Sequence, residues 1–204
     1  MIGYVVAIVA IAFIFDFTNG FHDSANSIAT IVGTRVLNPL AAVLWAAVFN
    51  FAAAFTGSLA VAKAIGGDMI HQSFVNPNVI LGALLGAIAW NLITWYSGIP
   101  SSSSHALIGG YAGAAMARGG TAAITWGVKW VQTLSFIVIS PFVGLAAGYI
   151  LMVIVFWLFR RSSASRVDRF FRPAQLVSSA LLSYSHGGND AQKTMGVIVG
   201  LLVS

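Results

Sequence analysis

Long apolar runs separated by short polar segments dominate the chain. Uncharged stretches cover residues 1–15, 40–62, 79–96, 106–117 and 131–159, and apolar character resumes after residue 173. At about 1.5 Å of rise per residue, the run over 40–62 forms a helix of about 34 Å, which is long enough to cross a bilayer. The pattern therefore predicts an all-α polytopic membrane protein.

The composition supports this class and excludes others. Hydrophobic residues make up 58% of the 204 residues and charged residues only 7%, with no glutamate, whereas soluble domains carry about 25% charged residues. A soluble enzyme, a nucleic-acid-binding domain and a disordered chain are excluded. A transmembrane β-barrel would show alternating apolar and polar residues. The long apolar runs of this chain do not alternate in this way, so a barrel is excluded. The absence of cysteine leaves no disulfide and no thiolate metal site.

Basic residues indicate the orientation in the membrane. Five arginines lie between Arg160 and Arg172, against the single acid Asp168, and such loops face the cytoplasm. Residues 160–173 are therefore predicted to form a basic cytoplasmic loop between a first transmembrane repeat over 1–159 and a second that begins at 174–204. Counting back places the segment from Gly66 to Asn78 outside the cell.

The span from residue 79 to 117 must then begin and end outside. Its second apolar arm, residues 106–117, measures only about 18 Å as a helix. Two crossings would satisfy this topology, but the short arm favours a re-entrant hairpin with its tip at residues 100–105.

The first polar cluster covers residues 16–27. Asp16, Asn19, Asp23 and Asn26 follow a helical spacing and are expected on one face. Carboxylates and amides inside a membrane are costly unless they face a polar cavity or ions. Gly20 is expected to allow local unwinding that frees carbonyl oxygens for a cation.

The second cluster, residues 97–105, contains four consecutive serines before His105. Pro100 ends the preceding helix and the serines cap the next one. Hydroxyl groups and free amides at a helix N-terminus form an oxyanion site. At the tip of a re-entrant hairpin, such a site would lie near the middle of the membrane.

The third cluster, residues 183–194, repeats the first in the opposite orientation. Residues 20–23 align with residues 187–190, so that Asp23 matches Asp190 and Asn26 matches Lys193. Inverted repeats with a central site are typical of secondary transporters. The Lys193 ammonium is expected to replace one of two symmetric cations beside a carboxylate, although a lysine that snorkels to the interface is the alternative.

These three clusters, in this order, resemble the inorganic phosphate transporter family. The resemblance implies a symporter of inorganic phosphate built from two inverted repeats, each with a broken helix and a re-entrant hairpin. It assigns phosphate binding to the serine–histidine tip and coupling to the paired aspartates. We expect phosphate at Ser102, Ser103, Ser104 and His105, and cation or proton coupling at Asp16, His22, Asp23, Asn26, Asn189, Asp190 and Lys193.

The chain also departs from the family. Members are longer, so the chain resembles an N-terminal part with an incomplete second repeat. Where many members have Ala-Asn before the first aspartate, this chain has Phe21-His22, which resembles the bacterial low-affinity branch. This branch is associated with proton coupling and metal–phosphate complexes, and Na⁺ coupling is the alternative.

The expected activity is therefore proton-coupled phosphate symport in the cell membrane. No resident cofactor or metal is expected, although Mg²⁺ or another divalent ion is a candidate co-substrate. The expected partners are phosphate and the lipid bilayer, not nucleic acid, and a homodimer is allowed. Two further alternatives are a divalent-cation transporter using His22, Asp23, His186 and Asp190, and an intramembrane serine hydrolase using Ser104 with a histidine.

Overall fold

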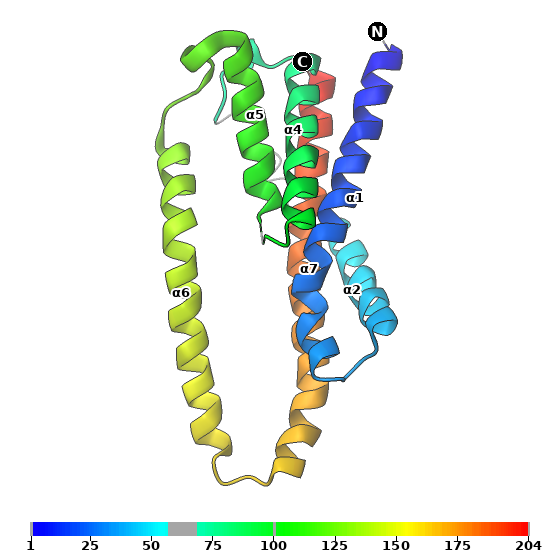
Figure 1. Cartoon of the computed structure of the whole chain (residues 1–204), viewed down its shortest axis with the longest axis vertical. Helices are drawn as coiled ribbons and strands as arrows, with labels where there is room; N and C mark the ends of the chain where they lie inside the picture. The colour runs from blue at the N-terminus through cyan, green and yellow to red at the C-terminus, as the bar shows by residue number, and fades with distance from the viewer. Residues whose placement is uncertain (1, 57–68, 100, 204) are drawn as a thin grey trace.

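The computed structural model describes residues 2–56, 69–99 and 101–203, which fold almost entirely into helices. Two long antiparallel helices, α1 and α7, cross near the middle of the molecule, and a hairpin of α4 and α5 packs beside them (Figure 1). The described chain therefore confirms the predicted all-α class. The helices are α1 (Ile2–Gly33), α2 (Pro39–Ala54), α4 (Pro77–Tyr96), α5 (Ser103–Gly119), α6 (Val128–Phe159) and α7 (Ala164–Val203), with short 3₁₀ turns η1 (Gln72–Phe74) and η2 (Gly120–Ala123).

Two helices begin at an Asn-Pro pair. The side chains of Asn38 and Asn76 accept hydrogen bonds from the amides of Ala41 and Val79, at 2.8 and 2.9 Å. The following proline occupies the first helical turn, where its missing N–H costs nothing. The sequence thus fixes where α2 and α4 start. Helix α2 ends at Ala54, and residues 57–62 of the predicted 40–62 span lie outside the described residues.

Helix α1 is unbroken, which contradicts the local unwinding expected at Gly20 and the broken helix of the predicted fold. The buried stripe that includes Phe15, Asn19 and Asp23 continues past Gly20 on one face, so packing holds the helix on both sides of the glycine. Helix α7 likewise runs without interruption through Gly187 and Gly188.

The basic stretch is mostly helical and not a loop, which corrects the prediction for residues 160–173. Only a short turn follows α6, and α7 begins at Ala164 and continues through Pro173. Arginine is a good helix former, and the Arg172 side chain pairs with Asp168 one turn earlier, at 3.1 Å. The division of the chain into repeats at this point stays a prediction.

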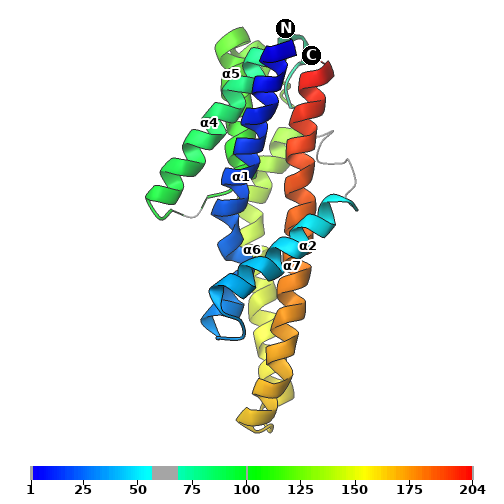
Figure 2. The same cartoon turned by 90° about the vertical axis from the view of Figure 1, so that its right-hand side faces the viewer.

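The hairpin of α4 and α5 joins the two helices about halfway along α7 and not at an end of the bundle (Figures 1 and 2). An apolar core that includes Ile8, Phe15, Leu84, Leu107 and Val197 fills the space among α1, α4, α5 and α7. The connection after α4 contains the predicted helix breaker Pro100, which lies outside the described residues. The hairpin thus carries its serine-rich tip into the interior of the bundle.

Three described helices are long and apolar enough to cross a membrane: α1, α4 and α6. Helix α6 has no buried residue, so its apolar side chains are open to lipid or to further protein. Helix α7 is more polar because it carries the basic stretch and the third polar cluster.

Two glycines allow helices to approach closely. A Cβ at Gly187 would lie 2.5 Å from the Asn50 Cα of α2, and one at Gly110 would lie 2.6 Å from the Ala83 carbonyl oxygen of α4. Both neighbours are backbone atoms, which cannot rotate away. Gly20, which the repeat aligns with Gly187, has no such neighbour within 4 Å.

We predict that Gly187→Ala destabilises the protein by about 1–3 kcal/mol, because the added methyl group forces α2 away from α7. Gly20→Ala is the matched control and should be neutral or stabilising by about 0.5–1 kcal/mol, since alanine favours helix. Thermal unfolding in detergent measures both, and equal melting temperatures for the two variants would contradict the prediction.

The two ends of the bundle give a topology prediction. The amide of His71 donates to the Ala123 carbonyl at 3.0 Å, which places η1 at the end opposite the α6–α7 turn (Figure 1). Ser163 precedes α7 and Ser73 lies exposed in η1. A single cysteine at Ser163 should be protected from an impermeant thiol reagent in intact cells, whereas one at Ser73 should react. The reverse pattern would overturn the positive-inside assignment. Residues 66–68 of the predicted outside segment lie outside the described residues.

Candidate functional site

The serine-rich tip forms the N-terminus of α5. Ser102 has extended backbone angles and its hydroxyl oxygen accepts a hydrogen bond from the His105 amide at 3.4 Å, as predicted for a helix cap. Ser103 and Ser104 occupy the first turn, where backbone N–H groups lack helical partners. The tip therefore presents hydroxyl groups and the positive end of a helix dipole.

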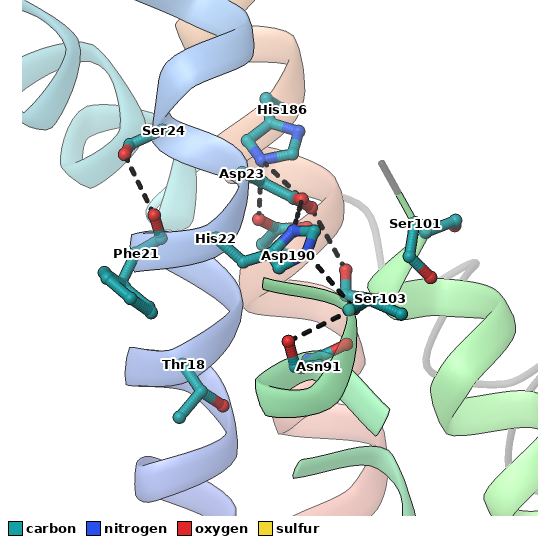
Figure 3. Close-up of polar contacts among 12 residues, drawn as sticks. Thr18, Phe21, His22, Asp23, Ser24, Asn91, Ser101, Ser103, His186 and Asp190 are labelled. Carbon is teal, nitrogen blue, oxygen red and sulfur yellow. Dashed lines mark hydrogen bonds and ion pairs between the residues drawn. The ribbon is translucent and has the colours of Figure 1, made fainter. Parts of the chain in front are cut away.

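The carboxylate of Asp23 on α1 faces this tip. Ser103 donates its hydroxyl hydrogen bond to Asp23 Oδ2 at 3.2 Å, and His22 Nδ1 lies 2.9 Å from Asp23 Oδ1. The three residues appear together in Figure 3, with His186 and Asp190 close by. Both oxygens of a buried carboxylate thus have partners from α1 and α5, as burial requires.

Helix α7 supplies a second carboxylate and a lysine. Lys193 Nζ lies 2.7 Å from Asp190 Oδ1, and His186 Nε2 lies 3.0 Å from Asp190 Oδ2. The spacings of three and four residues place all three side chains on one helix face. Lys193 Nζ also donates to Ser103 Oγ at 3.3 Å, so the lysine does not snorkel.

A cavity of about 290 Å³ lies where these groups meet. Its wall contains the two carboxylates, the lysine, the tip serines and two further α7 side chains: Asp23, Ser102, Ser103, Ser104, His186, Asn189, Asp190 and Lys193. Apart from any proton on His186, the wall has two carboxylates and one ammonium. A cavity with donors on one side and carboxylates on the other suits an anion that arrives with a cation.

Not every predicted residue reaches this cavity. Asn26 and His105 are exposed and do not line it, although both were expected in the site. Asn26 turns away because the buried stripe of α1 passes through Asp23 and Ser27. Asp16 lies elsewhere on α1, where it accepts a hydrogen bond from Thr194 at 2.8 Å.

Helix α4 contributes two buried polar residues that the sequence analysis missed. Thr94 Oγ1 lies 3.4 Å from His22 Nε2, and Asn91 is 1% exposed. They are three residues apart within an otherwise apolar run. This helical spacing could have indicated that α4 has a polar position on the face that meets α1. Thr94 extends the polar contacts of His22 beyond α1.

The side chains of Asp23, His186 and Asp190 offer ligand atoms within 4.8 Å of one another. Both oxygens of Asp190 already contact Lys193 or His186. The Asp190 carboxylate is therefore neutralised by side chains of the protein itself, and its geometry favours an ion pair.

Comparison with known proteins agrees with this arrangement. A family described as "Phosphate transporter family" matches residues 19–204. Rhizobium meliloti (strain 1021) and Bacillus subtilis (strain 168) each have a relative named "Probable low-affinity inorganic phosphate transporter". These are 53% and 48% identical and are matched over 98% of this chain. "Low-affinity inorganic phosphate transporter PitA" of Escherichia coli (strain K12) is 34% identical over 96% of this chain.

These proteins define a class of membrane transporters and not of enzymes, as the sequence predicts. The chain belongs to the phosphate transporter family, which confirms the resemblance of the three polar clusters. It spans 59% and 60% of the length of the Rhizobium and Bacillus relatives.

A solved structure titled "The sodium-dependent phosphate transporter" shares the fold. It superposes with a TM-score of 0.81 at 21% identity, over 98% of this chain and 68% of that one. At this identity the likeness concerns the helical architecture alone.

Proposed function

We propose that this chain takes part in the transport of inorganic phosphate across the cell membrane, with phosphate bound in the cavity at the α5 N-terminus. One observation carries the proposal: a serine-lined helix N-terminus and two carboxylates border one cavity inside an apolar bundle. A soluble phosphate-binding domain would not need such a cavity halfway along membrane-length helices. The names of the relatives support phosphate as the substrate.

The hydroxyl groups of Ser102 and Ser104 and the first free amides of α5 are the proposed phosphate ligands. Hydrogen bonds from neutral donors to an oxyanion are charge-assisted and strong, and the helix N-terminus favours negative charge. Ser103 differs from its neighbours because it is 1% exposed and its hydroxyl group already contacts Asp23 and Lys193. We assign it to the support of the site.

We further propose proton coupling, with phosphate carried alone or as a complex with a divalent ion. The cavity wall has two carboxylates and one ammonium, and phosphate adds further negative charge, so we expect a proton or another cation to accompany the anion. Asp23 with its neighbour His22 is the proposed acceptor, and Asp16, paired with Thr194, is the other candidate. Na⁺ coupling is the alternative, and a homodimer stays a prediction.

Substitution of the tip serines tests phosphate binding. Ser102→Ala and Ser104→Ala should each weaken phosphate affinity about 10- to 100-fold, because a lost hydrogen bond to a charged group costs roughly 1.5–3 kcal/mol. Uptake of radiolabelled phosphate is measured in cells that lack other phosphate carriers. The chain is expressed alone and fused to the unmatched part of the Rhizobium relative.

Ser101→Ala is the matched control, because the Ser101 hydroxyl accepts a hydrogen bond from Trp90 at 2.9 Å and lies outside the cavity. Its phosphate affinity should equal that of the unmodified protein. Unchanged affinity in Ser102→Ala and Ser104→Ala, with normal membrane insertion, would refute the proposed site.

Imposed ion gradients test the coupling. Phosphate uptake into proteoliposomes should follow an inward proton gradient and stop when a proton ionophore is added. Addition of Mg²⁺ separates transport of a metal–phosphate complex from transport of the free anion. Uptake that follows a Na⁺ gradient and ignores the ionophore would replace proton coupling with the Na⁺ alternative.

A further inference from the structure

Lys193 is the one lysine or arginine in the cavity wall, among the residues that the structure describes. We propose that its ammonium is a fixed counter-cation of the phosphate site, which takes the place of a co-transported cation in the second repeat. The proposal rests on the proposed function and adds to it the number of cations that must accompany each phosphate.

The contacts of Lys193 show a charge held in place. Its side chain is 6% exposed, and Nζ lies 2.7 Å from Asp190 Oδ1 and 3.3 Å from Ser103 Oγ. A buried ammonium is stable only where a carboxylate and further acceptors replace its water. The lysine therefore occupies the position between a carboxylate and a hydroxyl oxygen that a small cation would otherwise take.

The two repeats differ at this position. Asn26, the counterpart of Lys193, is exposed and does not line the cavity. Asp23, the counterpart of Asp190, is surrounded by the His22 and Ser103 side chains, with His186 Nε2 at 3.9 Å. Among the described residues, no lysine pairs with the Asp23 carboxylate, whereas Lys193 pairs with Asp190.

Charge counting gives the consequence for transport. With Lys193 present, Asp23 is the carboxylate that still needs a cation when the anion binds. Without Lys193, the wall keeps two carboxylates and has no ammonium, and an anion beside them needs one cation more. A purely structural role for Lys193, in which its hydrogen bond to Ser103 only joins α7 to α5, would not change this count.

Three substitutions separate charge from structure. Lys193→Asn introduces the first-repeat residue, whose amide oxygen can ligate a cation. Lys193→Arg keeps the charge, and Lys193→Met removes both the charge and the ligand. Lys129→Asn in α6 is the matched control, because it removes an exposed lysine outside the cavity.

The experiment measures phosphate uptake and the accompanying charge in proteoliposomes, over a range of proton and Na⁺ concentrations. In Lys193→Asn the Hill coefficient of phosphate uptake for the coupling cation should rise by about one. One more elementary charge should also move with each phosphate. Lys193→Arg and Lys129→Asn should match the unmodified protein. Lys193→Met, which has no ligand oxygen in place of the ammonium, should bind phosphate more weakly than Lys193→Asn at each cation concentration.

If Lys193→Asn folds but does not transport phosphate, its phosphate binding in detergent tests the proposal instead. Binding that is restored by added Na⁺ or protons supports the counter-cation, and binding lost at every cation concentration overturns it. Unchanged steepness and charge in a transporting Lys193→Asn would also overturn it. An unmodified protein that neither binds nor transports phosphate would instead refute the proposed function.

Discussion

The Lys193 ammonium connects α7 to the hairpin tip and, through Ser103, to α1. It binds Asp190 on its own helix and the Ser103 hydroxyl of α5, and Ser103 in turn donates to Asp23 of α1. Each member of this chain of contacts would be costly to bury alone. The tip of the hairpin, the crossing of α1 with α7 and the shape of the cavity therefore depend on one another, because each provides the partners that the others need.

The sequence predicted the parts of the site that follow from local rules. Ser102 caps a helix because a serine after a helix break does so in most settings, and Asp190 and Lys193 meet because they are three residues apart on one helix face. Asp23 was expected to face a polar interior, since no carboxylate tolerates lipid unpaired. These inferences needed no knowledge of the neighbouring helices.

The errors arose where the answer depended on a neighbouring helix. Helical periodicity placed Asn26 on the same side of α1 as Asp23. The structure shows that α5 and α7 cover Asp23 but leave Asn26 exposed, which periodicity alone cannot predict. Gly20 suggested unwinding, whereas continuous packing on both sides keeps α1 helical. Gly187 at the aligned position serves a different purpose, since it lets the α2 backbone approach α7. Residues that the predicted repeat aligns thus have different surroundings, and an alignment of the two segments alone cannot reveal this.

The position of the serine tip inside the bundle, and not at either end of it, would have an electrical consequence in a membrane. A charge that crosses a whole membrane exchanges about 2.3 kcal/mol with a potential of 100 mV, so one that stops near the middle exchanges about half of that. Because the tip lies about halfway along α7 (Figure 1), an ion that entered the proposed site from either side would meet only part of the voltage drop before it bound. The occupancy of the cavity would then respond to membrane voltage from both sides, whereas the fixed charge of Lys193 does not travel and adds nothing to that response.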